Sequence, residues 1–341
     1  MKNIYSLTLS KLENHFESIN ENKAKAKILF NHLYKKGISS FKEIDELSPR
    51  VKQKLSEDFC IDLPKCIKKS SDEQVEKVLF SLSDEKLIEA VLMRQKYGNS
   101  VCISTQIGCN MACSFCESGK HKTQRNLTAG EMVSQLMFMK NILKQDIKTV
   151  TIMGIGEPFQ NYENVMDFID IVTSDHGLGL GKRHVTVSTC GIVPKIVEYA
   201  KRENVNSLAV SLHACSDELR SKLMPINKLY SLNELKKSLE FYTSTTKNKV
   251  LLEYLMLENI NDSEQNAVQL CEFCKDLKCT VNLISYNETN TLDFKRSSFE
   301  TIMKFYDVLK KNGVHVTIRR EFGREVKAAC GQLKSEYIDE I

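Results

Sequence analysis

The stretch Cys102-Ile-Ser-Thr-Gln-Ile-Gly-Cys109-Asn-Met-Ala-Cys113-Ser-Phe-Cys116 ends in a C-x3-C-x2-C triplet. Three thiolates at this spacing converge readily on one iron–sulfur cluster. A 4Fe–4S cube has four irons, so three cysteines leave one iron open to a small molecule. Zinc also binds clustered cysteines, but zinc sites usually take two paired ligand sets. No second pair stands beside this triplet.

A cluster with an open iron is what a radical S-adenosylmethionine (SAM) enzyme requires, because the amino and carboxylate groups of SAM chelate that iron. We therefore expect Cys109, Cys113 and Cys116 to ligate a 4Fe–4S cluster. The sequence Cys271-x2-Cys274-x4-Cys279 is a weaker metal candidate. Its first two thiols lie at positions i and i+3 of a predicted helix, where cysteines more often pack in the core.

Short apolar strands alternate with amphipathic helices from residue 101 onward. The predicted strands are Val101–Ser104, Thr149–Met153, His184–Ser188, Ser207–Leu212, Val250–Met256, Thr280–Ile284 and His315–Ile318. The predicted helices include Ala129–Leu143, Leu232–Tyr242 and Phe299–Lys311. This alternation is typical of βαβ units and a parallel sheet. Because about six repeats are too few to close an eightfold barrel, we predict an α/β fold, a partial (βα)6 barrel over residues 96–320.

Residues 1–95 are predicted to form a small N-terminal helical/hairpin domain. Apolar residues fall at helical spacing in 26–34, and Ser48-Pro49 is typical of a helix cap followed by proline at the first helical position. The period then changes toward two, so 75–82 and 87–93 are predicted to pair as a hairpin. We interpret this module as an accessory RNA-binding domain. Residues 321–341 are predicted to form a separate C-terminal segment.

The composition indicates the compartment and permits an RNA partner. The chain has 341 residues, 12 cysteines and a net charge of +4. It contains no secretory apolar stretch and no run of eighteen apolar residues, so we expect a cytoplasmic protein without a disulfide framework. The mild charge permits RNA binding without demanding it. Two basic clusters suit phosphate contact, with a solvated face as the alternative: Lys120, Lys122 and Arg125, and Arg319, Arg320, Arg324 and Lys327.

Candidate cofactor-binding residues follow the predicted strands, because ligands of parallel α/β folds gather at the carboxyl ends of strands. In Gly154-Ile-Gly-Glu-Pro158, Gly156 permits close backbone approach and Glu157 is a candidate acceptor for the methionine amine of SAM. An ordinary turn is the alternative. Later strand ends supply candidates for ribose, carboxylate or adenine contacts, with a structural histidine and a turn-forming asparagine as the alternatives: Ser188, Ser211, Leu212, His213 and Asn287.

Three further residues are candidates for catalysis. Glu89 stands in an apolar strand, where the pattern favours an exposed side chain unless the carboxylate is functional. Cys102 precedes the triplet, and Cys330 lies in Ala328-Ala-Cys-Gly-Gln-Leu333. Each cysteine alone is more often a small buried hydrophobe. If the two meet over the cluster, they form a reactive dithiol with a transient disulfide.

Taken together, these features resemble the radical SAM adenosine methyltransferases of the RlmN type, which have the antibiotic-resistance Cfr enzymes as close relatives. The resemblance spans nearly the whole chain and rests on the joint order of its motifs. They are Glu89 ahead of Cys102-Ile-Ser-Thr-Gln-Ile-Gly-Cys109, the triplet, Arg125-Asn-Leu-Thr-Ala-Gly-Glu131, Met153-Gly-Ile-Gly-Glu-Pro158, Val185-Thr-Val-Ser-Thr, Ala209-Val-Ser-Leu-His213, Met224-Pro-Ile-Asn227 and Ala328-Ala-Cys-Gly-Gln-Leu333.

The resemblance implies both a mechanism and partners. Cys330 takes a methyl group from one SAM, and a radical made from a second SAM removes hydrogen from the methylated Cys330. The carbon radical adds to an amidine carbon of adenine. Glu89 accepts the proton, and Cys102 releases the product by bonding to Cys330. The implied cofactors are one 4Fe–4S cluster and SAM, and the implied partners are ribosomal or transfer RNA and an electron donor such as flavodoxin or ferredoxin. The chain is expected to be a monomer.

The resemblance leaves alternatives. RlmN-type enzymes methylate carbon 2 of an adenosine in large-subunit ribosomal RNA, which the segment 127–131 and the strand 184–188 favour here. Three segments depart from the RlmN pattern: Glu117-Ser-Gly-Lys-His-Lys122, the Glu-Thr-Asn that follows Asn287, and Arg319-Arg-Glu-Phe-Gly323, whose Phe-Gly is similar to Cfr. Cfr-like carbon-8 methylation conferring antibiotic resistance is therefore one alternative. A radical SAM activase or maturase acting on protein is a second, and a non-catalytic RNA-binding module with a structural metal is a third.

Overall fold

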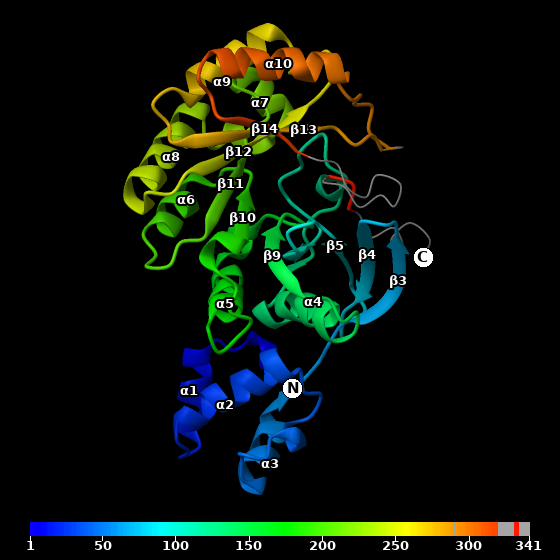
Figure 1. The fold of residues 1–341 in the computed structure, drawn as a ribbon, viewed down its shortest axis with the longest axis vertical. Coiled ribbons are helices and arrows are strands. Elements are labelled where there is room, and N and C mark those ends of the chain that lie inside the picture. Colours follow the sequence, from blue (N-terminus) through cyan, green and yellow to red (C-terminus); the bar gives the residue numbers. More distant parts are fainter. Residues whose placement is uncertain (290, 320–330, 334–341) are drawn as a thin grey trace.

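The computed structural model describes residues 1–289, 291–319 and 331–333. Its centre is a curved ten-stranded sheet in the order β14-β13-β12-β11-β10-β9-β6-β5-β4-β3 (Figure 1). Seven neighbouring strands of this sheet pair in parallel. They are β6 (Asn99–Cys102), β9 (Ile147–Ile152), β10 (Val185–Thr189), β11 (Ser207–Ser211), β12 (Val250–Met256), β13 (Cys279–Ser285) and β14 (Val316–Ile318).

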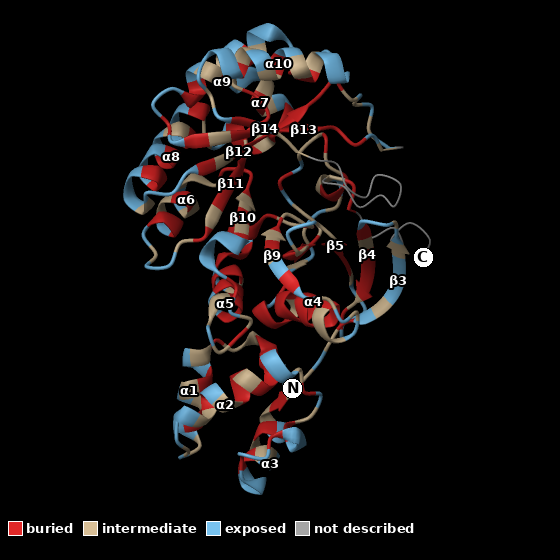
Figure 2. Cartoon of the chain, viewed as in Figure 1, coloured by how far each residue is buried: buried red, intermediate tan, exposed pale blue. Residues whose placement is uncertain are grey.

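Helical crossovers join each parallel strand to the next. The helices are α4 (Ala129–Asn141), α5 (Tyr162–Thr173), α6 (Val193–Ala200), α7 (Asp217–Leu223), α8 (Leu232–Thr246), α9 (Glu264–Cys274) and α10 (Phe299–Lys311). The strands are mostly buried, and most of the helices bury one face and expose the other, whereas α4 is buried along nearly its whole length (Figure 2). Seven strands joined by six crossovers form the partial (βα)6 barrel that the sequence predicts.

The predicted strands and helices of the barrel are confirmed, with small shifts at their ends. Strand β12 and helix α10 match the predicted ranges. Helix α8 begins with a capping box, in which the Ser231 hydroxyl and the Glu234 side chain bond reciprocally to backbone N–H groups. It continues to Thr246, four residues beyond the predicted end, and stops where Lys247 adopts a left-handed conformation.

The N-terminal residues form a compact helical group. It comprises α1 (Leu9–Ser18), α2 (Ala24–Asn31) and α3 (Pro49–Asp58), with a short parallel pair of β1 (Lys2–Asn3) and β2 (Phe59–Cys60). As predicted, Ser48 caps α3 by accepting from the Val51 N–H, and proline occupies the start of the helix. In Figure 1 the group lies beside α4 and α5, and the Ser6 hydroxyl accepts from the Gly130 N–H of α4.

Three antiparallel strands extend the barrel sheet: β3 (Lys65–Ser71), β4 (Val75–Ser81) and β5 (Leu87–Met93). The predicted hairpin is confirmed as β4 and β5, whereas β3 was not predicted as a strand. β3 is a largely exposed, lysine-rich edge strand, so it lacks the apolar pattern that marks a strand in sequence. β5 pairs with β6, so the hairpin and the barrel form one continuous sheet. The proposed division at residue 95 stays a prediction.

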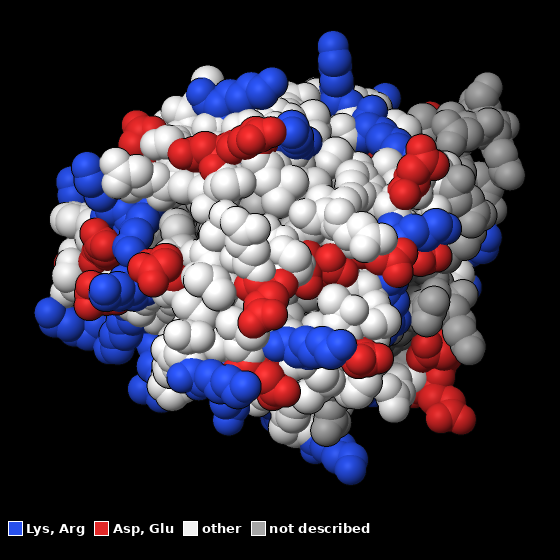
Figure 3. Space-filling model, turned by 90° about the horizontal axis from the view of Figure 1, so that it is seen from above, with Lys and Arg blue, Asp and Glu red and all other residues white. Residues whose placement is uncertain are grey.

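The described surface carries no dominant charge of one sign on the face shown in Figure 3. Basic and acidic groups are interspersed there, as the mild net charge suggests. Within the described residues, no helix combines the length and apolar character needed to span a membrane. Any concentration of charge that matters for a partner must therefore be local.

Candidate active site

A cavity of ≈ 890 Å³ opens at the carboxyl ends of strands β9 to β13. All three cysteines of the triplet line it. Five of the predicted cofactor-binding residues also line it: Gly156, Glu157, Ser188, Ser211 and His213. The structure therefore gathers the predicted cluster ligands and most of the predicted SAM contacts around one space.

The triplet lies on a loop closed at its base by two short strands, β7 (Gln106–Ile107) and β8 (Arg125–Asn126), which pair antiparallel. Gly108 begins the loop with φ +77°, and a Cβ there would lie 2.3 Å from the Lys122 carbonyl oxygen. Only glycine fits this approach without backbone displacement. The loop is thus folded tightly enough to present its cysteines to one side.

Burial keeps two cysteine thiols of the triplet in their neutral form. Burial raises the pKa of Cys109 to about 12 and raises that of Cys113 well above its usual range. These thiols stay protonated until a metal displaces the proton. Among the described residues, no three His, Cys, Asp or Glu side chains are grouped to hold one metal ion. Three thiols around one cavity are compatible with a multi-iron cluster, in which each binds a different iron.

Glu157 is fixed by hydrogen bonds inside the cavity wall. Gly156 precedes it with φ +108°, a conformation that favours glycine. The Glu157 carboxylate accepts from the Thr189 hydroxyl (2.7 Å) and from the backbone N–H groups of Cys190 (2.8 Å) and Phe159 (3.0 Å). Burial raises its pKa, and these donors oppose that effect. The carboxylate therefore ties the glycine-containing turn to the end of β10.

Arg220, which the sequence analysis missed, is fully buried beside the cavity. Its guanidinium donates to four neutral acceptors: the carbonyls of Cys190 (2.8 Å), Ser211 (3.0 Å) and Leu212 (3.1 Å) and the Asn227 side-chain oxygen (3.0 Å). Its positive charge lowers the pKa of the Cys113 thiol, opposing the larger effect of burial. Arg220 thus fixes the ends of β10 and β11, and no local motif marks such a role.

His213 contacts the cavity as a neutral imidazole. Its Nδ1 accepts from the Leu255 N–H (3.0 Å), and its carbonyl accepts from the Asn261 amide (2.8 Å). Burial, together with the charge of Arg220, lowers its pKa to about 3. The remaining ring proton is therefore on Nε2, where it is a hydrogen-bond donor.

Two buried acceptors near the cavity accept no hydrogen bond from the described residues. One is Oε1 of Glu253, a cavity-lining residue that the sequence analysis missed. Its other oxygen accepts from the Asn282 amide (3.0 Å), and burial raises its pKa. The second is Oδ1 of Asn287, which lies two residues beyond β13. Buried acceptors are costly unless a donor reaches them, so both suit a ligand rich in N–H and O–H groups, such as SAM.

Glu89 is buried, so the expectation of an exposed side chain is wrong. Only 1% of the residue is exposed, and its carboxylate lies 2.9 Å from the ammonium of Lys77, itself 5% exposed. The two side chains come from neighbouring strands, β5 and β4. A pattern read along one strand does not show the partner on the next.

Cys102 and the residues after Cys330 lie near the same cavity. Cys102 packs in a small apolar cluster that also contains Ile155 and Leu333. Gly331 lines the cavity itself. Cys330 lies outside the described residues, so its predicted meeting with Cys102 stays a prediction. Of the residues that follow it, Gly331 lines the cavity with the triplet and Leu333 packs with Cys102.

Residues 331–333 are held by hydrogen bonds from both sides. The Glu117 N–H donates to the Gly331 carbonyl (2.9 Å), and the Ser118 hydroxyl donates to the Leu333 carbonyl (2.7 Å). From the other side, the Gln332 amide donates to the Glu288 carbonyl (3.1 Å). The segment that follows Cys330 is therefore bound to the cluster loop and to the loop after β13.

Glu117 and Lys120 of the cluster loop contact Thr291 in the loop after β13. The Thr291 hydroxyl donates to the Glu117 carboxylate. The Lys120 ammonium donates to the Thr291 carbonyl (2.7 Å) and lies 3.5 Å from Glu117. Glu117, Lys120 and Thr291 thus join the cluster loop directly to the loop after β13.

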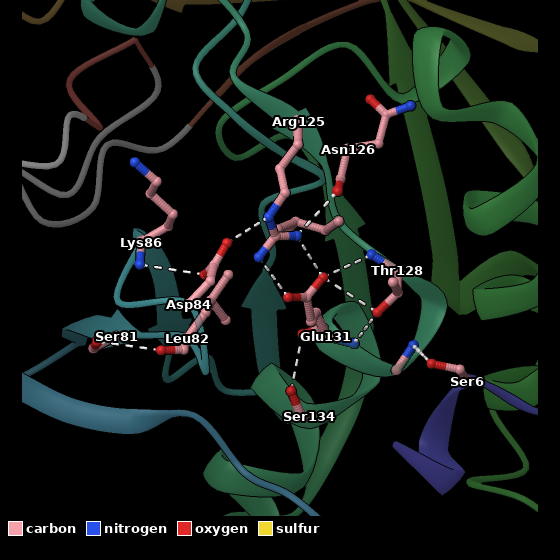
Figure 4. Close-up of polar contacts among 12 residues, drawn as sticks. Ser6, Ser81, Leu82, Asp84, Lys86, Arg125, Asn126, Thr128, Glu131 and Ser134 are labelled. Carbon is pink, nitrogen blue, oxygen red and sulfur yellow. Dashed lines mark hydrogen bonds and ion pairs between the residues drawn. The ribbon is translucent and has the colours of Figure 1, made fainter. Parts of the chain in front are cut away.

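Arg125 is committed to structure, contrary to a role in phosphate contact (Figure 4). Its guanidinium bonds to both carboxylate oxygens of Glu131 (2.9 and 2.7 Å) and to Asp84 (2.8 Å). Glu131 also accepts from the Thr128 N–H in the capping box of α4. Arg125 therefore connects the hairpin turn to α4. In the second predicted basic cluster, Arg320, Arg324 and Lys327 lie outside the described residues.

Residues from two other predictions lie in the hydrophobic core. Leu212 is fully buried there, and it meets the site only through its backbone. Cys274 and Cys279 also belong to the core, where their side chains hydrogen-bond to each other. That bond and burial raise the pKa of Cys274.

A partial barrel with a three-cysteine loop above a SAM-sized cavity defines the radical SAM class. The family model described as the radical SAM superfamily matches residues 103–271. A second model, the N-terminal domain of ribosomal RNA large subunit methyltransferases, matches residues 2–61. A radical SAM methyltransferase from Sphaerobacter thermophilus has the same fold, with a TM-score of 0.92 and 35% identity over 98% of this chain and 99% of that one.

Full-length relatives carry the comparison further. A probable dual-specificity RNA methyltransferase RlmN from Clostridium botulinum (strain Alaska E43 / Type E3) is 45% identical over 99% of this chain and 98% of that protein. The protein of the same name from Listeria welshimeri is 41% identical over 99% of this chain and 95% of that protein. The chain therefore belongs to the RlmN family of radical SAM RNA methyltransferases.

Proposed function

We propose that this enzyme methylates carbon 2 of an adenosine in large-subunit ribosomal RNA, and an adenosine of transfer RNA as well, through a methylated cysteine. The observation that carries the proposal is the position of residues 331–333. Gly331 lines the cluster cavity and Leu333 packs in the same apolar cluster as Cys102. This placement supports a Cys330 sulfur that serves the cavity and is reached by Cys102.

The triplet and the cavity wall fit the two cofactors that the family implies. Cys109, Cys113 and Cys116 would hold a 4Fe–4S cluster, which when bound supplies the electron that cleaves SAM to a 5′-deoxyadenosyl radical. For SAM we propose contacts from Gly156, Ser188, Ser211 and His213 at the cavity, from Asn287, and from the backbone of Leu212. We add Glu253, whose unsatisfied oxygen suits a ribose hydroxyl. Because Glu157 already accepts three hydrogen bonds, we assign it to holding the turn around the methionine end.

The protein residues divide the remaining chemistry. The Cys330 sulfur accepts a methyl group from one SAM, forming a carbon–sulfur bond. After hydrogen is removed from that methyl group, its carbon bonds to the adenine carbon. Glu89, held by Lys77, accepts the proton that leaves the adenine carbon. The adduct radical returns one electron to the electron-donor couple as that proton leaves. The Cys102 thiolate then attacks the Cys330 sulfur and forms a disulfide, while the departing CH2 carbon keeps the bonding pair and takes up a proton to become the methyl group.

The partners follow from this chemistry. An electron donor such as flavodoxin or ferredoxin reduces the cluster, and RNA supplies the adenine. We propose that the enzyme works as a monomer in the cytoplasm. The printed description "dual-specificity" of the relatives supports action on more than one RNA.

Two substitutions test the mechanism. Cys102→Ala is expected to trap the protein covalently on RNA, because the adduct with Cys330 then has no resolving thiol. Cys330→Ala is expected to abolish methylation without forming an adduct. Denaturing electrophoresis with labelled RNA separates these outcomes. Methylation that survives in Cys330→Ala contradicts the mechanism.

The cofactors and the methylated atom need separate measurements. Anaerobic reconstitution should give about four irons per chain and 5′-deoxyadenosine only with SAM and reductant. Zinc in place of iron contradicts the radical assignment. Mass spectrometry of RNA nucleosides, with 2-methyladenosine and 8-methyladenosine as standards, decides between carbon 2 and the Cfr-like carbon 8.

A further inference from the structure

A second hollow, of ≈ 1920 Å³, lies toward the amino ends of the barrel strands. Threonine and serine side chains of β6, β9 and β10 line its floor, and its rim carries Lys96, Tyr97 and Arg183. None of its described lining residues is an aspartate or glutamate. The described lining of the hollow therefore carries basic groups and hydroxyls without an acidic side chain, although the surface of Figure 3 shows mixed charge.

The hollow adjoins the cluster cavity along two strands. Thr151 and Thr186 line the hollow, and Met153 and Ser188, two residues further along, line the cavity. Alternate residues of a strand face the same side, so both spaces lie on one inner face of the sheet. Two residues of strand span about 6.6 Å. Arg319 lines both spaces, so a molecule in the hollow lies next to the cluster cavity.

Two cations at the rim lack ion pairs within the described part of the chain. Lys96 and Arg183 are exposed, and neither bonds to another described residue. Arg94, by contrast, is paired with Glu76. Tyr97, which is 74% exposed, lines the same hollow. Unpaired cations beside an exposed aromatic ring are the elements that bind single-stranded nucleic acid, through phosphate contact and base stacking.

A buried hydroxyl inside the hollow is also unsatisfied. Oγ1 of Thr151 has no hydrogen-bond partner among the described residues, although it is shielded from solvent. A hydroxyl both donates and accepts, so a ribose hydroxyl or a phosphate oxygen satisfies it. This observation points to a ligand independently of the charges at the rim.

We propose that the hollow binds the sugar–phosphate backbone of single-stranded RNA next to the adenosine whose base enters the cluster cavity. Arg183 and Lys96 contact phosphates, Tyr97 stacks on a neighbouring base, and Thr151 bonds to the backbone near the floor. The proposal rests on the proposed function for the identity of the bound RNA as the methylation substrate.

The charges are tested by the double variant Lys96→Ala/Arg183→Ala, made in the cluster-loaded enzyme. RNA binding is measured by filter retention at several salt concentrations. Each lost phosphate contact on a single strand lowers the steepness of log affinity against log salt by about 0.7, so the double variant should lose about 1.4. Lys237→Ala, an exposed position on the outer helix α8, is the matched control and should bind like the wild type.

The aromatic ring is tested separately. Tyr97→Ala should weaken RNA binding about tenfold, with the salt dependence unchanged, because stacking carries no charge. Tyr97→Phe keeps the ring and should restore binding. If the alanine variant binds as tightly as the wild type, the stacking part of the proposal is overturned.

Controls separate this proposal from the proposed function. Methylation of Cys330 by SAM without RNA, measured by peptide mass spectrometry, should be unchanged in the double variant, because that step needs no RNA. Wild-type enzyme that binds RNA with the expected salt dependence but makes no methyladenosine contradicts the proposed function alone. Unchanged affinity and salt dependence in the double variant overturn the RNA-binding hollow. Inorganic phosphate that binds the wild type but not the variant, with RNA affinity unaffected, would assign the hollow to a free anion and also overturn it.

Discussion

The two sides of the cluster cavity differ in how completely their polar groups are satisfied. On the side of β10 and β11, Glu157 accepts three hydrogen bonds and the Arg220 guanidinium donates four. On the side of β12 and β13, Glu253 and Asn287 each keep a buried oxygen that accepts nothing from the described residues. On the first side, protein groups satisfy these buried polar side chains. On the second side, a ligand is needed to donate hydrogen bonds to the remaining oxygens. The difference separates residues that stabilise the structure of the site from residues that are available to bind a ligand.

The largest effect is expected at Arg220. Arg220→Met removes a donor from each of four buried acceptors, of which the Leu212 carbonyl keeps the Ala214 N–H, and should destabilise the protein by about 3 kcal/mol or more. Urea unfolding of the cluster-free protein measures this. Arg220→Lys keeps the charge and part of the hydrogen bonding, so its free energy of unfolding should lie between those of the wild type and Arg220→Met. A stable Arg220→Met protein would show that this side of the cavity does not need its internal bonds.

A smaller effect is expected at Glu157. Glu157→Gln keeps the shape but replaces one acceptor oxygen by an NH2 group, which faces donors from Thr189 or Cys190. We expect a loss of about 1–3 kcal/mol in the free energy of unfolding. Glu163→Gln, on exposed helix α5 surface, is the control. Equal stability of the two variants would contradict the distinction drawn between the sides.

Substitution of Glu253 should lower the affinity for SAM and leave the stability of the protein nearly unchanged. Because burial raises its pKa and one oxygen is unsatisfied, Glu253→Gln should leave the unfolding free energy of the ligand-free protein within about 0.5 kcal/mol of the wild type. Its SAM affinity should fall about tenfold, corresponding to one lost hydrogen bond to a charged group. Calorimetric titration of SAM measures this. Lower stability with unchanged SAM affinity would show that Glu253 stabilises the protein and does not bind SAM.

The smallest effect is a pH dependence at His213. Its pKa is about 3 in the folded protein and about 6.5 when unfolded, so only the unfolded chain takes up a proton as the pH falls through 6.5. Stability should therefore decrease by roughly 0.7 kcal/mol from pH 7 to pH 6 on account of this residue. His213→Gln should remove that part of the decrease, measured as urea midpoints at both pH values. An identical pH dependence in the variant would show that His213 is not the group responsible.

Sequence alone predicts the barrel and gathers much of the site, and the misses share one cause. The apolar strands and the glycine-containing turn have recognisable local sequence patterns. The cavity-lining residues Gly156, Ser188 and Ser211 could therefore be predicted. Glu253 lies in an apolar strand and Arg220 in a short helix. The role of each depends on residues distant in the chain, which the local sequence does not show. Glu89 was expected to be exposed for the same reason, because Lys77 lies on the adjacent strand.

The contact among Glu117, Lys120 and Thr291 constrains how this lineage is able to change. It joins two loops more than 170 positions apart in the chain. A substitution in one loop alters the surroundings of the other, so the two segments should have diverged as a matched set. Chimeras that exchange one loop with a relative should fail where chimeras that exchange both succeed.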